Sequence, residues 1–193
     1  MTIFDLLFLF LALVSLLTWG TALIVALRGR RARALRILRN FGVSALAYLA
    51  IVAIVGVLAP QRVLRLHEPW CFDDWCLAVE SVTRAPAADT VVYNVSLRLS
   101  SRALRVSQSA KGAWIYLVDP QRNRYAPEPD PSAVSLEVRL GPGESVTTSR
   151  VFRVAAGAGP LGLITGHGPA WLPAFIIADE ASLLHKPTYV RLE

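Results

Sequence analysis

The sequence predicts a hairpin of two transmembrane helices followed by an antiparallel β-sandwich, and three observations lead to this fold class. Two uncharged apolar runs, Leu6 to Leu27 and Phe41 to Pro60, are each about as long as the roughly 20 residues that a helix needs to cross a bilayer. The segment between them is dense in arginine. From Leu77 onward, apolar and polar residues alternate in short segments separated by turn residues. The predicted parts are a membrane hairpin (1–60), a connector with a cysteine loop (61–76) and a β-sandwich with a C-terminal extension (77–193).

The predicted hairpin has spans at about residues 3–27 and 41–60, joined by a cytoplasmic loop at 28–40. The loop contains six arginines: Arg28, Arg30, Arg31, Arg33, Arg36 and Arg39. Short loops rich in arginine and lysine stay on the cytoplasmic side of a membrane. We therefore expect a protein of the inner (cytoplasmic) membrane, with both termini and all of 61–193 outside the cytoplasm.

The first apolar run is expected to stay in the protein rather than to be removed as a signal peptide. The residues MTIFD before it carry no positive charge, and no small-residue cleavage site precedes the arginines. The second run is richer in small residues, which let two helices pack closely. Neither run has an ionisable residue near its middle, where transport paths usually need one, so a transporter or channel is disfavoured.

The net charge of +6 could suggest a nucleic-acid partner, but its distribution argues against one. Residues 61–193 have twelve Arg and two Lys against thirteen acidic residues, a net charge of +1. The excess therefore lies in the arginine segment, where it is the expected topology signal. The same arginines suit anionic lipid head groups, so the expected partner is the lipid bilayer and not nucleic acid.

The two cysteines of the chain, Cys71 and Cys76, stand in the segment WCFDDWC. If the predicted topology holds, they lie in an oxidising compartment, where an even number of cysteines favours a disulfide. Phe72 to Trp75 would then form a turn, which Asp73 and Asp74 suit. A redox dithiol and a thiolate metal site are the alternatives. Redox motifs favour two residues between the cysteines and here there are four, and a metal site needs further ligands nearby.

Period-two segments predict the strands of the sandwich. The clearest is Thr90 to Ser100, in which alternate residues from Val91 to Leu99 are apolar. Further segments that alternate or suit strands are Leu77 to Val82, Trp114 to Val118, Arg124 to Ala126, Ser135 to Leu140, Ser145 to Val154 and Tyr189 to Leu192. We expect an Ala-Pro loop at 85–88, turns at 119–123 and 141–143, and a flexible or close-packed glycine-rich stretch from 157 to 168.

Three of these segments, YNVSLRLSS (93–101), WIYLVDPQRNRY (114–125) and LGPGESVTTSRVFRV (140–154), carry a family resemblance. The chain resembles the Ig-like β-sandwich domains of unknown function found in bacterial secreted and membrane-anchored proteins. In those domains a Pro-Gly turn, here Pro142-Gly143-Glu144, precedes a strand that ends in a buried Phe, here Phe152. The resemblance covers roughly residues 77–165 and implies an Ig-like sandwich. It carries over no catalytic residue, and the two-span anchor and the C-terminal extension depart from it.

Candidate catalytic and metal-binding residues are few. His67, His167 and His185 have no metal-ligand spacing, so we interpret them as hydrogen-bonding histidines. Ser182, His185 and Asp179 contain the residue types of a hydrolase triad, but no Gly-x-Ser-x-Gly elbow accompanies them. The sequence therefore predicts no catalytic residue, no cofactor and no metal site.

The leading hypothesis is a membrane-tethered extracytoplasmic β-sandwich that acts as an interaction or envelope-assembly module, with an envelope protein as partner. Two alternatives stay open. One is an envelope enzyme or metal-handling protein that uses acidic residues near the cysteine loop, namely Asp73, Asp74, Asp179 and Glu180. The other is an accessory subunit of a larger membrane complex.

Overall fold

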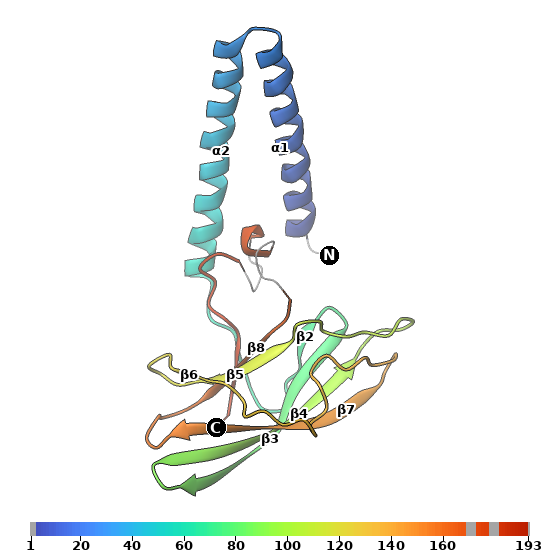
Figure 1. Ribbon diagram of the computed structural model, residues 1–193, viewed down its shortest axis with the longest axis vertical. Helices are drawn as coiled ribbons and strands as arrows, with labels where there is room; N and C mark the ends of the chain where they lie inside the picture. Colours follow the sequence, from blue (N-terminus) through green and yellow to red (C-terminus); the bar gives the residue numbers. More distant parts are fainter. Residues whose placement is uncertain (1–2, 169–172, 178–181, 193) are drawn as a thin grey trace. The chain divides into compact units, whose positions relative to one another are not determined.

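The computed structural model describes residues 3–168, 173–177 and 182–192, which fall into two compact units (Figure 1). The helical unit comprises Met1–Pro60 and Ala170–Lys186, and the β unit comprises Gln61–Pro169 and Pro187–Glu193. The segment predicted as the C-terminal extension divides between the two units, because Ala170–Lys186 groups with the helices.

The helical unit is built on α1 (Ile3–Leu27) and α2 (Arg31–Leu58), and both are long and apolar enough to cross a membrane by length and composition. They pack side by side, with Trp19 edge-on to Phe41 at 6.3 Å between ring centroids. Within the segment 28–40, predicted as the cytoplasmic loop, Arg31 to Arg39 are helical. These arginines alternate with Ala, Leu and Ile, and Arg, Ala and Leu are strong helix formers.

The connection between α1 and α2 is only three residues long. Gly29 takes a left-handed conformation there, with φ at 77°, which glycine adopts without steric cost. At the other end, α2 stops at Leu58 ahead of Pro60, as the sequence predicts.

Contacts between described residues hold the C-terminal segment of the helical unit against α2. The Tyr48 hydroxyl donates a hydrogen bond to the carbonyl of Phe175 at 2.7 Å, and Phe175 belongs to a short 3₁₀ helix (Pro173–Phe175). A Cβ atom at Gly56 would collide with the carbonyl oxygen of Leu183. Residue 56 must therefore be glycine for this segment to approach the helix backbone.

The β unit is a sandwich of two sheets, with strand orders β2-β3-β4-β7 and β1-β9-β8-β5-β6 (Figure 1). All described pairs are antiparallel except β1 with β9. The strands are β1 (Val63–Leu64), β2 (Trp70–Phe72), β3 (Trp75–Ala87), β4 (Thr90–Ser101), β5 (Trp114–Val118), β6 (Arg124–Tyr125), β7 (Ser145–Ala155), β8 (Gly162–Gly166) and β9 (Tyr189–Arg191). The predicted β-sandwich is confirmed at this level of description.

The core lies between the sheets and follows the alternation of the sequence. In β4, Val95, Leu97 and Leu99 are fully buried, while the residues between them are exposed or half-buried. Phe152 of β7 is also fully buried, as predicted. The facing sheet contributes Leu117, Leu163 and Val190, none of which is exposed. A period of two thus places one face of each strand in the core.

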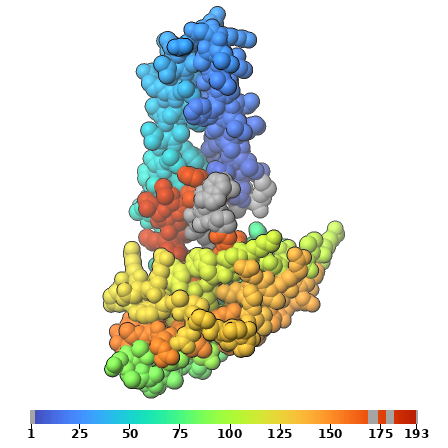
Figure 2. Space-filling view, in the orientation of Figure 1, coloured from blue at the N-terminus to red at the C-terminus, as the bar shows by residue number. Residues whose placement is uncertain are grey.

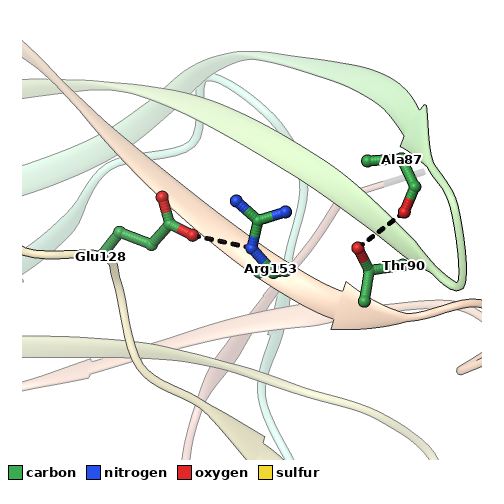
Figure 3. A network of polar contacts seen from close by, with 4 residues as sticks. All are labelled: Ala87, Thr90, Glu128 and Arg153. Carbon is green, nitrogen blue, oxygen red and sulfur yellow. Dashed lines mark hydrogen bonds and ion pairs between the residues drawn. The ribbon is translucent and has the colours of Figure 1, made fainter.

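The predicted Ala-Pro loop at 85–88 is wrong, because β3 continues through Pro86 to Ala87. Pro86 pairs with Val91 in a long hairpin that turns at 88–89. Strand β2 pairs with β3 only from Trp75 to Leu77, so in the described residues Pro86 lies on an edge of the sheet, where proline is tolerated. The Thr90 hydroxyl donates to the Ala87 carbonyl at 2.9 Å and closes the turn (Figure 3).

In the second half of the domain, the glycine-rich stretch is close-packed, which is one of its two expected alternatives, whereas the strand expected at Ser135 to Leu140 does not form. The glycine-rich stretch contains strand β8, which pairs with both β5 and β9 and is almost entirely buried. Ser135 to Leu140 alternates but is not a strand, and only Leu140 forms an isolated bridge, with Gln108. The Val138 nitrogen instead donates to the Ser135 carbonyl at 3.1 Å, so the alternating residues form a turn that packs Leu136 and Val138 on the core.

The proline-rich loop at 127–131 is tied to β7. The Glu128 nitrogen donates to the carbonyl of Val151 at 2.7 Å. The Arg153 guanidinium forms an ion pair with the Glu128 carboxylate, with Nε and Oε1 3.0 Å apart (Figure 3).

Candidate functional site

The segment with the two cysteines folds as a short β-hairpin. Cys71 of β2 and Cys76 of β3 lie opposite each other in the antiparallel register, and a disulfide joins them, with Cα atoms 3.9 Å apart. Asp73 and Asp74 make the turn, and Asp73 has a left-handed φ of 52°, which Asp tolerates better than most residues. The predicted disulfide and its turn are confirmed.

Aromatic side chains enclose the base of this hairpin. Trp70 and Trp75 are 3% and 2% exposed, and Phe72 packs against both, with ring centroids 5.3 Å and 6.0 Å away. His167, beyond β8, lies edge-on to Phe72 at 4.4 Å. The disulfide is thus part of a packed cluster that joins the two sheets, which supports a structural role for it.

The acidic residues of the metal alternative are not assembled in the part of the chain that the structure describes. Asp73 and Asp74 are exposed at the hairpin tip. Asp179 and Glu180 lie outside the described residues. Among the residues that are described, no group of three or more His, Cys, Asp or Glu side chains could hold a metal ion.

The Ser182 and His185 side chains occupy one tight turn of the helical unit. The His185 nitrogen donates to the Ser182 carbonyl at 3.0 Å. Among the described residues, the buried Ser182 hydroxyl and the Nδ1 atom of His185 have no hydrogen-bond partner. The third residue of the sequence-level grouping, Asp179, lies outside the described residues.

A buried carboxylate organises the turn after β5. Asp119 is 5% exposed and accepts hydrogen bonds from the Asn123 backbone (2.8 Å), the Asn123 side chain (2.8 Å) and the Tyr125 hydroxyl (3.0 Å). Burial acts to raise the pKa of Asp119, but these hydrogen bonds outweigh it, so the pKa lies below its usual value. Burial and the bond to Asp119 raise the pKa of Tyr125. The predicted turn at 119–123 is confirmed, and its acid stabilises the structure.

A row of aromatic and basic side chains lies on the outer face of the five-stranded sheet. The Trp114 and Tyr116 rings are stacked at 5.2 Å with 7° between their planes, and the Arg124 guanidinium lies 4.8 Å from the centre of Tyr116. Trp114 is 43% exposed. The row is the described feature of the β unit best suited to contact another molecule, since aromatic and arginine side chains dominate binding surfaces.

Glycines of β8 make room for this outer face. A Cβ atom at Gly166 would collide with the Trp114 ring, and one at Gly162 would come within 2.5 Å of the Tyr189 ring. Sequence reasoning did not find the row. The available signal was the spacing of Trp114 and Tyr116, two residues apart on one face of a strand, together with two glycines four residues apart in LGLITG.

The helical unit contains a groove of about 610 Å³ between α1, α2 and Phe175, and Figure 2 shows the hollow between the helices. Most of its walls are apolar. The hydroxyls of Ser15 and Tyr48 are already bonded to carbonyl oxygens, at 2.7 Å each. The groove thus suits apolar contact better than chemistry.

Comparisons with known proteins add partial likenesses in fold. No protein-family model and no curated protein matches the chain. An uncharacterized β-sandwich protein from Clostridium difficile 630 is similar over 69% of this chain and 95% of its own, with 6% identity and a TM-score of 0.44. A conserved hypothetical protein from Bacillus anthracis covers 53% of this chain and 89% of its own (14% identity, TM-score 0.42). The YjhA protein from Bacillus subtilis covers 67% and 99% (15% identity, TM-score 0.43). These likenesses assign no site or activity to this chain.

Proposed function

We propose that the protein is a membrane-tethered binding module of the cell envelope, in which α1 and α2 cross the inner membrane and an Ig-like β-sandwich works outside the cytoplasm. The observation that carries this proposal is the arginine cluster at the connection of the two apolar helices. All six arginines are exposed. If these arginines lie on the cytoplasmic side, both ends of the helical hairpin lie outside the cytoplasm.

Helix lengths support a full crossing. The part of α2 after Arg39, from Asn40 to Leu58, is about 28 Å long at 1.5 Å per residue, close to the roughly 30 Å of a hydrocarbon core. The preceding turns of α2 carry the arginines and would project into the head groups and the cytoplasm. The disulfide between Cys71 and Cys76 supports an oxidising location for the β unit.

The binding role is supported by the row formed by Trp114, Tyr116 and Arg124. The opposite faces of β5 and β8 pack in the core. The exposed part of the Trp114 side chain therefore does not contribute to core packing. Trp, Tyr and Arg are the residues that most often dominate the energy of an interface. We therefore place the binding surface on the outer face of the five-stranded sheet, with an envelope protein as partner.

A reporter enzyme that works only outside the cytoplasm tests the topology. Fused after Glu193 it should be active, and fused after Arg33 in a truncated chain it should be inactive. A matched variant with Arg28, Arg30, Arg31 and Arg33 changed to Gln should lose part of the activity of the Glu193 fusion, because the topology signal is weakened. An inactive reporter after Glu193 in the unchanged chain would contradict the proposed topology.

Photo-crosslinking in intact cells tests the binding surface. A crosslinking amino acid at Trp114 should give a discrete adduct with one envelope protein, and excess protein with Trp114→Ala should fail to compete for it. Thr83, exposed on β3 of the other sheet, is the control position and should give no such adduct. The same products from both positions, or none from Trp114, would remove the support for this surface.

A further inference from the structure

The loop between β4 and β5 exposes apolar side chains in an otherwise well-packed domain. Leu104 is 91% exposed and Val106 is 66% exposed. Of the large apolar side chains in the described residues, Leu104 is the most exposed, and this includes those on the outside of α1 and α2. A single exposed leucine needs no explanation. Two such residues, two positions apart at the tip of a fixed loop, call for a partner surface.

The same loop is cationic. Between Arg102 and Gly112 the chain has Arg102, Arg105 and Lys111 and no acidic residue, and all three cations are exposed. The cations at 102 and 105 flank Leu104. Apolar side chains between cations are the pattern that lies at the boundary of lipid head groups and acyl chains.

Hydrogen bonds and buried side chains fix the base of the loop, so its tip is exposed and does not fold back onto the domain. The Arg102 nitrogen donates to the Asp74 carbonyl at 2.7 Å. Gln108 forms a two-way bridge with Leu140, with nitrogen to oxygen distances of 2.8 and 2.9 Å. Ala103 and Ala110 are 6% and 5% exposed and anchor the loop in the domain.

The loop lies at the end of the sandwich from which the chain leaves for the helical unit. The Gly168 nitrogen, just past the end of β8, donates to the Lys111 carbonyl at 3.1 Å. Strand β9 is antiparallel to β8 and parallel to β1, so Tyr189 and Val63 begin their strands at this same end. The chain passes from one unit to the other after residues 60, 169 and 186. All three connections therefore join the sandwich at this end.

We propose that the loop tip, residues 104–106, inserts into the outer surface of the bilayer that holds α1 and α2, with Arg102 and Arg105 on lipid phosphates. This proposal rests on the membrane tether proposed above. Four residues, Ala59 to Arg62, join α2 to β1, and fully extended they span at most about 14 Å. Under this proposal, the short connection holds that end of the sandwich near the membrane surface, where lipid is the nearest apolar phase.

Depth-dependent fluorescence quenching on the full chain in lipid vesicles tests the insertion. Single cysteines are introduced as Leu104→Cys, Ala85→Cys and Leu17→Cys and labelled with a small polarity-sensitive dye without reductant, so that the Cys71–Cys76 disulfide stays closed. Ala85 is exposed near the opposite end of the sandwich and is the matched control. Leu17 lies in the middle of α1 and is 62% exposed, so a dye at this position tests whether α1 lies in the bilayer.

We expect quenchers on the lipid acyl chains to quench the dyes at 104 and 17 and to leave the dye at 85 unaffected. Quenching at 17 without quenching at 104 overturns the loop insertion while the tether stands. Equal quenching at 104 and 85 also overturns it, since the whole domain would then lie on the lipid. No quenching at 17 overturns the tether, and the loop proposal with it.

The phosphate contacts are tested by Arg102→Gln and Arg105→Gln in the labelled Leu104→Cys protein. In vesicles containing phosphatidylglycerol, each change should shift the equilibrium between inserted and free loop roughly fivefold toward the free form, which follows from about 1 kcal/mol per cation at an anionic surface. In phosphatidylcholine vesicles the shift should be smaller. Equal quenching of the variants and the parent in both lipids would contradict the role of the arginines.

Discussion

The helical unit and the β unit use the same apolar residue types in opposite ways. In α1, Leu16 and Leu17 are 71% and 62% exposed, and Ala22 is the one residue of the helix that is buried among those the structure describes. In the β unit, Leu97 and Leu117 are not exposed at all. Leucines of the second kind stabilise a fold in water, whereas a leucine surface of the first kind is the type that lipid covers in the proposed membrane tether. The exposed fractions of the leucine side chains therefore distinguish the two units more clearly than their composition does.

The largest difference is expected from one matched pair of substitutions. Leu97→Ala removes a fully buried side chain and should lower the free energy of unfolding of the β unit by roughly 3–5 kcal/mol. Leu16→Ala, on the outside of α1, should leave that free energy unchanged. Denaturant unfolding of the full chain in detergent micelles, followed by the fluorescence of buried Trp70 and Trp75, measures both. Equal losses for the two variants would contradict the assignment of separate cores.

The long periodic elements were predictable from sequence because each is specified by its own residues. Residues 90–100 alternate over their whole length, so the pairing face follows from the pattern alone. The apolar helices follow from length and composition in the same way. The disulfide was also predictable, since only one pairing of two cysteines exists.

Elements that depend on partners far along the chain were missed. Strand β8 has glycine at both ends, and it is a strand because β5 and β9 flank it and aromatic rings fill the space above the glycines. Ser135 to Leu140 has the alternation of a strand, but only Leu140 pairs with a distant residue, Gln108, and Leu136 and Val138 pack on the core from a turn. The row at Trp114, Tyr116 and Arg124 was missed although the turn at 119–123 and the segment after it were expected, because the pattern did not show that Arg124 would lie over the Tyr116 ring.

The disulfide should contribute the next largest effect within the β unit. Changing both Cys71 and Cys76 to Ala should lower the free energy of unfolding by roughly 2 kcal/mol, the value for closing so short a loop in the unfolded chain. The fold should survive, because the buried aromatic cluster and the core remain. The same unfolding assay measures this loss, and counting free thiols in unreduced, unfolded protein checks the bond. Two reactive thiols in protein taken from the membrane would contradict it.

A smaller, pH-dependent contribution is expected from Asp119. Its pKa is lower in the folded state than in the unfolded chain, so its stabilising effect is present above its unfolded pKa and is lost as the pH falls through its folded value. The parent protein should therefore lose more stability between pH 5 and pH 2, roughly, than Asp119→Asn, which keeps the size but not the charge. Thermal unfolding at stepped pH measures the difference. Parallel pH profiles for the two proteins would show that the turn does not depend on the carboxylate.

The smallest effect on stability is expected from the exposed ion pair between Arg153 and Glu128. Charge there has a different role from charge in the helical unit. Their side chains are 52% and 43% exposed, so water and salt screen the attraction. A double-mutant cycle with Arg153→Gln and Glu128→Gln should give a coupling free energy below about 1 kcal/mol that fades with added salt. The arginines at the connection of α1 and α2 are exposed as well, yet under the proposed topology the removal of several of them should change the orientation of the chain in the membrane. A coupling of several kcal/mol for the Arg153 pair would mean that the 127–131 loop is fixed by charge, and not by the backbone hydrogen bond from Glu128 to Val151.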